Sequence, residues 1–391
     1  MADHRVVDVV DDQLGILAGR LAVSRSRGAE RYRFTYAEEF LGHPHSYDLD
    51  PALPRRGAPL TVARLFGAFT DAAPDRWGRM LIDRGHHGHV FESDYLFEVH
   101  DPLRQGALRF RENGRWLNAA GTVPRLVDLA PLRALARQVV AGDPRLVHRA
   151  ATQLLDVGTS ALGGAHPKVS VVGDDGILHI AKLAWEPADS HHLRNEHATL
   201  TLMAEVGLRT AGKPVLLGDE GAHSALLIPR FDRTAAGRIA YASAKTLLGA
   251  AEGERADYLD IASLLEESGS DPADQQELFR RVLFNAVVQN TDDHLRNHGF
   301  IRLSGRWRLS PVFDVNPNID RAAGHATSLD GRTDTAGILA ALPAAAAAMG
   351  VERHDAARFA QTVARSVESS LLDGAVKEMV HETAGAAARL F

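Results

Sequence analysis

The sequence contains no cysteine, and this absence removes several classes of protein at once. Its 391 residues offer no thiol for a disulfide, a thiolate zinc site, an iron–sulfur cluster or a cysteine nucleophile. The most apolar tract, 337–350, is short and mostly alanine, and Pro343 interrupts it, so it does not predict a membrane-spanning helix. The first residues also lack the basic and then apolar segments of a secretion signal. We therefore expect a cytoplasmic protein with no membrane partner.

Lysine is scarce as well, since only five of the 44 basic residues are lysine. In a chain that uses arginine wherever any cation suffices, a remaining lysine can mark a place that needs a compact ammonium group. Two of the five, Lys168 and Lys182, lie 14 positions apart. Chance retention on the surface is the alternative. The net charge of −6 argues against a protein whose main task is to coat nucleic acid, although a local basic patch stays compatible with it.

The apolar pattern predicts three domains of the α+β class. Residues 1–125 read as a mixed α/β subdomain. Residues 126–242 read as a strand-rich small lobe, and 243–391 as an all-helical large lobe broken only by a strand pair over 300–309. By analogy alone, a small strand-rich lobe followed by a helical lobe suggests a nucleotide bound in the cleft between them.

The expected elements follow from periodicity and from turn residues. Strands are predicted at 15–23, 31–36, 169–172, 177–184, 213–217 and 225–231, and a hairpin over 106–118 turns at Asn113-Gly114. Helices are predicted at 60–69, 76–84, 126–140, 194–206, 243–251, 257–267 and 274–290, with two or three more after 335.

The densest group of polar residues follows the predicted helix at 274–290. It reads Asn290-Thr291-Asp292-Asp293-His294-Leu295-Arg296-Asn297. Two adjacent acids at the C-terminal end of a helix are unfavourable unless a cation or ligand offsets them. Asp292 and Asn297 have the spacing that protein kinases use for a catalytic Asp and a Mg²⁺-binding Asn, and Asp314 follows after one hairpin, as a second metal-binding Asp does. A solvated loop, with Asp314 as a turn former, is the alternative.

Upstream, Lys182 lies in an alternating strand that resembles the lysine-bearing strand of protein kinases. Glu196 falls on the apolar face of the next predicted helix, where a buried carboxylate needs a partner, and Lys182 is the natural candidate. The alternative is an acid that only favours the helix start. Before that strand, Gly163-Gly164 would let backbone N–H groups approach a phosphate closely.

Together these motifs resemble the HipA-type toxin kinases of bacterial toxin–antitoxin modules. The resemblance is dense over 150–320 and includes the Arg230-Phe231-Asp232-Arg233 segment. The front of the chain, with Trp77-Gly78-Arg79 and Gly106-Ala107-Leu108, is similar to the N-terminal subdomain of the family. The resemblance implies a bilobal protein-kinase-like fold and an ATP- and Mg²⁺-dependent serine/threonine kinase.

By position, the resemblance implies a role for each site residue. Asp292 would be the catalytic base, and Asn297 and Asp314 would hold Mg²⁺. The ATP-binding residues would be Gly163, Gly164, Ala165, His166, Pro167, Lys168, Lys182, Pro229, Arg230, Phe231, His294, Asn297 and Phe313, with Glu196 as the supporting ion-pair partner.

The family also implies partners. Its members phosphorylate a protein serine, in known cases on an aminoacyl-tRNA synthetase. A small helix-turn-helix antitoxin of the HipB type restrains them and links them to DNA. Some are silenced by autophosphorylation in the phosphate loop; the corresponding position here is Ala161, which leaves the adjacent Ser160 and Thr159 as candidates.

One departure from the family pattern and two rival interpretations stay open. The family often has Glu where this chain has Pro229, which could cost one donor to adenine. The chain could also be a catalytically weak co-repressor that acts with its antitoxin on operator DNA. A metal-dependent phosphohydrolase that uses Asp292, Asp293, His294 and Asp314 is the third interpretation.

Histidine and arginine clusters carry less weight. The histidines over 86–89 and 43–45 could bind metal, but exposed loop residues explain them more simply. The stretch 25–33 holds four arginines and reads as a solvated hairpin, with contact to an antitoxin or DNA as the alternative.

Overall fold

The computed structural model describes residues 3–86, 88–157, 166–218, 224–320 and 322–391, and the chain forms two compact units. The first unit comprises Met1–Asp189 and Leu217–Ala242, and the second comprises Ser190–Leu216 and Ser243–Phe391. The chain therefore passes between the units three times. The boundary predicted at 125 lies inside the first unit, and the three-domain division stays a prediction.

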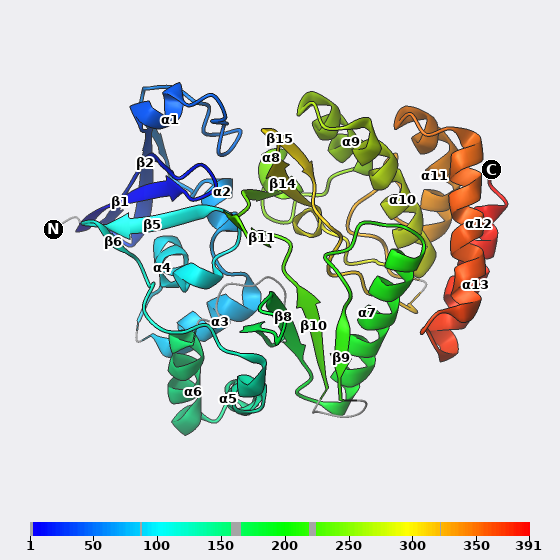
Figure 1. Cartoon of the computed structure of the whole chain (residues 1–391), viewed down its shortest axis with the longest axis horizontal. Coiled ribbons are helices and arrows are strands. Elements are labelled where there is room, and N and C mark those ends of the chain that lie inside the picture. Colours follow the sequence, from blue (N-terminus) through cyan, green and yellow to red (C-terminus); the bar gives the residue numbers. More distant parts are fainter. Residues whose placement is uncertain (1–2, 87, 158–165, 219–223, 321) are drawn as a thin grey trace. The chain divides into compact units, whose positions relative to one another are not determined.

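A six-stranded antiparallel sheet opens the first unit, in the order β4-β3-β2-β1-β5-β6 (Figure 1). Its strands are β1 (Asp3–Asp11), β2 (Ile16–Ser26), β3 (Ala29–Tyr36), β4 (Leu60–Val62), β5 (Leu108–Glu112) and β6 (Arg115–Trp116). In β3, Tyr32 and Phe34 are buried while Arg31 and Arg33 are exposed, which is the alternation of a sheet with one solvated face. The predicted hairpin is confirmed, because Asn113 and Gly114 both have positive φ, as a two-residue turn requires.

Two predictions for this region were wrong or incomplete. The helix predicted at 60–69 is strand β4, followed by helix α2 (Gly67–Asp71), because 60–62 pair with β3. Strand β1 was missed because its valines come in pairs separated by aspartates, with a bulge at Val9/Val10, which hides the period of two. Short helices complete the region: α1 (Glu38–Gly42), α3 (Arg76–Gly85), α4 (Glu92–Glu98) and η1 (Asp101–Leu103).

The second sheet of the first unit contains β7 (Lys168–Val172), β8 (Leu178–Leu183) and β10 (Ala225–Pro229), all antiparallel. Two helices, α5 (Leu129–Ala141) and α6 (Pro144–Asp156), pack with it around one core that also takes in Trp77 and Leu81 of α3. The sequence analysis predicted α5, which follows η2 (Leu126–Asp128), but missed α6. Its buried Ala150, Ala151 and Leu154 have helical spacing.

The second unit is helical around α10 (Pro272–Val288), in which Phe279, Val282, Leu283 and Val287 are buried. Figure 1 shows α11 (Thr335–Ala348), α12 (Arg353–Ser369) and α13 (Gly374–Ala388) in the orange and red part of the chain. The other elements are α8 (Ala244–Leu247), α9 (Tyr258–Glu267), η4 (Leu295–Asn297), β14 (Gly299–Leu303) and β15 (Arg306–Leu309). The strand pair predicted over 300–309 is confirmed.

Several segments connect the units or lie beside those connections. Helix α7 (Pro187–Glu205) carries the chain into the second unit, β9 (Val215–Leu217) returns it, and β13 (Tyr241–Ser243) crosses again after the small hairpin β11 (Arg233–Thr234) and β12 (Gly237–Arg238). Helix α7 starts seven residues earlier than predicted, and α8 ends before Gly249, whose φ is positive. In the ranges that the structure describes, no helix is both long and apolar enough to cross a bilayer.

Candidate active site

Lys168 and Lys182 lie directly opposite each other on the neighbouring strands β7 and β8. Directly paired residues of an antiparallel sheet project to the same face, about 5 Å apart at Cβ. Both lysines are buried, with 3% and 9% of their surface exposed. Two like charges in such a pair destabilise the sheet. Two of the five lysines of the chain thus share one face of the sheet, and the ammonium group of lysine is a compact charge that suits phosphate oxygens.

The backbone beside these lysines is tightly held. The indole Nε1 of Trp77 donates to the carbonyl oxygen of Lys168 at 3.0 Å, and the amide of Leu183 donates to the carbonyl of Pro167 at 2.9 Å. The ring Nδ1 of His166 lies 3.9 Å from Oδ1 of Asp189. The preceding loop, with Thr159, Ser160, Gly163, Gly164 and Ala165, lies outside the described residues, so its phosphate-binding role stays a prediction.

Strand β10 ends at Pro229, the position where the family often has Glu. The amide of Arg230 donates to the carbonyl of Leu178 at 2.9 Å, so Pro229 pairs with His179 without backbone hydrogen bonds. A proline at this position therefore removes no bond of the ladder to β8. The Phe231 ring lies 6.1 Å from that of Tyr241.

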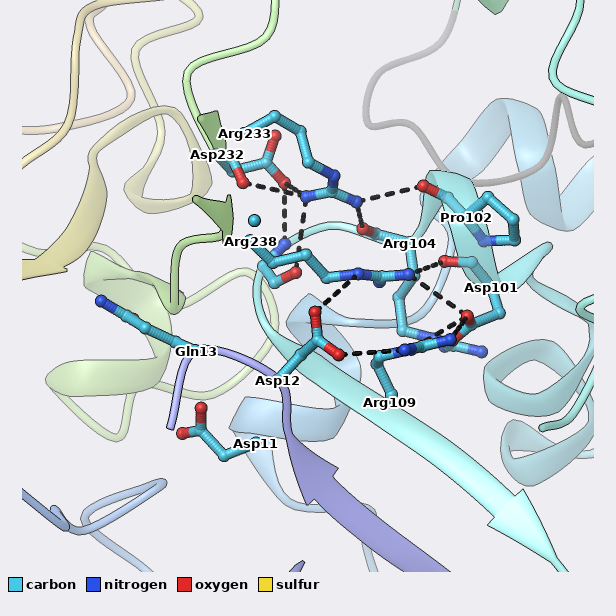
Figure 2. Close-up of polar contacts among 12 residues, drawn as sticks. Asp11, Asp12, Gln13, Asp101, Pro102, Arg104, Arg109, Asp232, Arg233 and Arg238 are labelled. Carbon is cyan, nitrogen blue, oxygen red and sulfur yellow. Dashed lines mark hydrogen bonds and ion pairs between the residues drawn. The ribbon is translucent and has the colours of Figure 1, made fainter. Parts of the chain in front are cut away.

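Asp232 follows Phe231 in the sequence, and its buried carboxylate joins the segment after β10 to the backbone at Gly106 (Figure 2). Both oxygens of Asp232 accept bonds from Arg230, at 2.8 and 2.6 Å, and Oδ2 also accepts from Arg233 at 2.8 Å and from the amide of Gly106 at 2.8 Å. Burial would raise the pKa of Asp232, but Arg230 and Arg233 more than offset it and lower the pKa to about 2. The carboxylate is therefore ionised throughout the physiological range.

The same cluster continues into the turn after β1 and into η1 (Figure 2). Asp101 accepts bonds from Arg109 and Arg238, and Arg109 also bonds Asp12 at 2.9 Å. Arg104 is fully buried and donates to the carbonyl groups of residues 72, 96 and 99. Burial lowers the pKa of Arg104 to about 9, so its guanidinium stays charged at neutral pH. The 230–233 motif alone does not indicate these partners, because they lie more than 100 positions earlier in the sequence.

In the second unit, the polar loop begins where α10 ends. Gln289 adopts a left-handed conformation that stops the helix after Val288, two residues before the predicted end. Asp292 is exposed and its neighbour Asp293 is buried. The amide of His294 and the side-chain Nδ2 of Asn297 both donate to the backbone oxygen of Asp292, at 2.9 and 3.0 Å. The backbone carbonyl of Asp292 therefore holds both His294 and Asn297 within the loop.

Asn297 and Asp314 have features that suit a cation. Because Nδ2 of Asn297 is used in the bond to Asp292, its amide oxygen is the atom that a metal ion would take. Asp314 has φ of +59°, a left-handed conformation that is uncommon outside glycine and is often found at functional sites. Carboxylate and amide oxygens are the donors that Mg²⁺ prefers. Phe313 precedes Asp314 and is half-buried, as is His294.

Glu196 is fully buried on α7, in agreement with its predicted inward face. It belongs to the second unit and Lys182 to the first, so their pairing stays a prediction. Histidines 43, 45, 86 and 89 are half-buried or exposed, and within the described ranges no three His, Cys, Asp or Glu side chains gather as a metal site. The sequence gives Asp293 a role only in the phosphohydrolase alternative, although its side chain is buried and hydrogen-bonded.

The fold is mixed α/β with the strand-rich and helical parts of a kinase-like protein. A solved HipA of Shewanella oneidensis, in a complex with HipB and its operator DNA, matches it with a TM-score of 0.70 at 17% identity, over 98% of this chain and 96% of that one. A model of the HipA-like C-terminal domain matches residues 160–371, and a model of the HipA N-terminal domain matches residues 14–98. The first match spans more than half of the chain, and the chain therefore belongs to the HipA family.

Two curated relatives are similar in sequence. A Haemophilus influenzae protein named "Putative kinase" is 30% identical over 135 residues, which cover 31% of this chain and 39% of that protein's own length. The "Putative kinase Y4mE" of Sinorhizobium fredii is 26% identical over 322 residues, which cover 72% of this chain and 71% of that protein. Both relatives carry the word kinase in their names, and the matches cover 39% and 71% of their lengths.

Proposed function

We propose that this protein is a HipA-type toxin that transfers the γ-phosphoryl group of ATP to a serine or threonine of a cellular protein. The observation that carries the proposal is the buried, directly opposed pair of Lys168 and Lys182. Lysine is a compact point charge that suits phosphate oxygens, and two lysines on one face of the sheet can donate to successive phosphates of one nucleotide. The exposed Asp292 then supplies the acceptor for the hydroxyl proton.

In this proposal the nucleotide is held by the first unit. Lys182 contacts the α- and β-phosphates, and Lys168 with the loop from Gly163 to Pro167 covers the phosphates. The adenine base contacts the backbone at Pro229, Arg230 and Phe231. The amide of Arg230 is already bonded to Leu178, and Pro229 has no N–H but keeps its carbonyl, so the adenine contacts would use other backbone groups of this segment.

The second unit would supply the proton acceptor and the metal ligands. Asp292 accepts the proton of the substrate hydroxyl, and Asn297 and Asp314 hold Mg²⁺, with His294 and Phe313 along the nucleotide. Bound Mg²⁺ would neutralise charge on the phosphates. Glu196 would orient Lys182 through an ion pair. The hydrogen bond from Asn297 to the backbone of Asp292 keeps the proposed base and the proposed metal ligand in one fixed loop.

We further propose the partners that such a toxin needs. The Shewanella relative was solved with HipB and operator DNA, which supports a small helix-turn-helix antitoxin and DNA contact through it. The substrate is a cytoplasmic protein, and an aminoacyl-tRNA synthetase is the first one to test. The co-repressor interpretation would keep the antitoxin and lack phosphotransfer.

Phosphotransfer itself is the test. The purified chain is incubated with γ-³²P-ATP, Mg²⁺ and heat-treated bacterial lysate as the acceptor, and label is followed in protein and in free phosphate. We expect label on protein serine or threonine with the wild type, and a loss of about 10²–10⁴-fold with Asp292→Asn. This variant should still bind ATP, because it removes a negative charge.

Lys182→Arg separates the kinase from its rivals. A planar guanidinium does not replace a compact ammonium between a carboxylate and phosphates, so labelling should fall at least about tenfold. Equal labelling by Lys182→Arg would contradict the assigned role. Release of free phosphate from phosphoprotein without labelled product would favour the phosphohydrolase, and antitoxin binding without any transfer would favour the co-repressor.

A further inference from the structure

Asp292 and Asp293 are adjacent in sequence but have opposite surroundings. Asp292 is exposed, whereas Asp293 is only 3% exposed. The Oδ2 atom of Asp293 accepts hydrogen bonds from the hydroxyl of Tyr258 on α9 and from Nδ2 of Asn285 on α10, the latter at 2.7 Å. The Nε2 atom of His298 lies 3.0 Å from the same oxygen. One carboxylate thus joins two helices to the residue that precedes β14.

All of these partners are buried, so the cluster is sealed from water. Tyr258 is 1% exposed, and Asn285 and His298 are each 3% exposed. Burial alone would raise the pKa of Asp293, but His298 and the hydroxyl of Tyr258 more than offset it, and the pKa is lowered. Burial and Asp293 together raise the pKa of Tyr258 well above its usual value, so its hydroxyl remains a donor. A buried carboxylate with three partners is expensive to misplace.

The backbone around Asp293 is held as firmly as its side chain. The hydroxyl of Thr327 donates to the carbonyl of Asp293 at 2.5 Å, and the amide of Ala326 donates to the carbonyl of Thr291 at 2.9 Å. At the far end of the loop, the amide of Ala244 donates to the carbonyl of His298 at 2.7 Å. The polar loop is therefore fixed on both sides of Asp292 while the Asp292 side chain itself is left exposed.

We propose that Asp293 is a positioning residue for phosphotransfer: its carboxylate, held by Tyr258, Asn285 and His298, fixes the loop that presents Asp292. This proposal rests on the proposed kinase function. It predicts a separation of kinetic effects, because Asp293 belongs to the loop and not to the proposed nucleotide contacts. Loosening the loop would misplace the base by a fraction of an ångström to an ångström, and such displacements lower turnover by up to about 10²-fold.

The test compares Asp293→Asn, which is nearly isosteric, with the milder Tyr258→Phe, which keeps the ring and removes one donor. We expect kcat to fall about 10–100-fold in Asp293→Asn and about 3–10-fold in Tyr258→Phe, with KM for ATP within about twofold of the wild type. Combining the two changes should lower kcat by much less than the product of the single effects, because both act on one carboxylate.

Val363→Ala is the matched control. Val363 is fully buried in α12 of the same unit, so its truncation lowers stability without touching the loop. At a similar loss of thermal stability, it should leave kcat unchanged. If Asp293→Asn and Tyr258→Phe lower the melting temperature but leave kcat unchanged, Asp293 only stabilises the fold and the proposal is overturned.

Hydrogen exchange of the loop gives a second readout that does not depend on activity. The amides of His294 and Asn297 are hydrogen-bonded within the loop and should exchange at least about tenfold faster in Asp293→Asn, with no change in Val363→Ala. Unchanged exchange would overturn the positioning role. If the wild type transfers no phosphate to protein, the kinase function fails on its own, and the exchange of these amides still decides whether Asp293 holds the loop.

Discussion

The indole of Trp77 donates a hydrogen bond to the carbonyl oxygen of Lys168, 91 positions later in the chain. Trp77 is 1% exposed, so its replacement by Phe would leave a buried carbonyl without this donor, at a cost of about 1–3 kcal/mol. We expect Trp77→Phe to lower the free energy of unfolding by that amount in urea denaturation. Trp116→Phe, at a half-buried ring, is the control and should cost less. Equal losses would mean that ring volume, not the hydrogen bond, matters.

The opposed lysines of β7 and β8 make a prediction about anions. Tripolyphosphate should raise the melting temperature of the wild type, since binding to the folded state stabilises it. In Lys168→Met this gain should shrink by at least about half, because the shared anion loses one of two charges. Lys245→Met removes a lysine that pairs with Glu252 at 3.2 Å and should leave the gain intact. If tripolyphosphate raises the melting temperature of Lys168→Met as much as that of the wild type, an anion site at these two lysines is excluded.

Gly106 has little room for a side chain. Its φ is +74°, and an added Cβ would lie 3.2 Å from Cβ and 3.3 Å from the amide nitrogen of Tyr241. Gly28 has a similar φ of +77° but open space around it. Gly28→Ala should therefore cost only the left-handed conformation, about 1–2 kcal/mol, whereas Gly106→Ala should cost roughly 1 kcal/mol or more beyond that. Chemical denaturation of both variants measures the difference, and equal costs would show that Tyr241 yields freely.

Asp232 gives the protein an acid-sensitive element. Its pKa falls from 3.8 to about 2 on folding, because Arg230 and Arg233 outweigh burial. A carboxyl whose pKa is depressed by folding contributes stability above its unfolded pKa and loses that stability as pH falls through the folded pKa. The contribution, about 2 kcal/mol, should therefore be complete near pH 5 and lost by about pH 2.

Asp232→Asn tests this sign. The variant should lose stability at pH 6, where the wild-type carboxylate is charged, and its unfolding free energy should depend less on pH between about 5 and 2. Parallel pH dependence in the two proteins would assign the acid sensitivity to other groups.

Self-regulation is predicted at Ser160 or, second, at Thr159. A phosphate there adds about −1.5 to −2 charges and would compete with ATP for the same loop and for Lys168. Long incubation with ATP and Mg²⁺ should add one phosphate, detected by intact-mass spectrometry, and none in Asp292→Asn. The double variant with alanine at both positions should stay active longer. If the wild-type protein gains no mass, it does not phosphorylate itself, and the antitoxin alone would regulate its activity.

Local signals predicted much of the fold, and they named the candidate site residues, whose roles stay predictions. Turn residues located the hairpins at Asn113-Gly114 and at 300–309, and spacing singled out Asp292 and Asn297. The sequence shows that Lys168 and Lys182 lie 14 positions apart, but it does not predict that they pair directly across two strands. Pairing depends on the register across the turn, and a slip of one residue would move one lysine to the other face.

The missed features depend on distant segments. The salt-bridge cluster joins Asp12, Asp101, Arg109 and Arg238, and no periodicity relates these positions. The sequence does not distinguish Asp293 from the adjacent Asp292, because the two residues are chemically identical. The structure distinguishes them, because Asp293 is buried and Asp292 is exposed. Buried polar networks depend on tertiary contacts, and the pattern of a single sequence does not predict those contacts.

The cluster around Asp232 bears on how the chain can be divided. The family models match residues 14–98 and 160–371, yet Trp77 of the first match bonds Lys168 of the second, and Gly106, which lies between the two matches, bonds Asp232, all within one compact unit. A fragment that starts at residue 160 would leave Arg238 without Asp12 and Asp101, and the carbonyl of Lys168 without Trp77. It would also lose the helices that complete its core. The borders of the family models thus differ from those of the compact units, and a piece expected to fold as the first unit has to extend through residue 242.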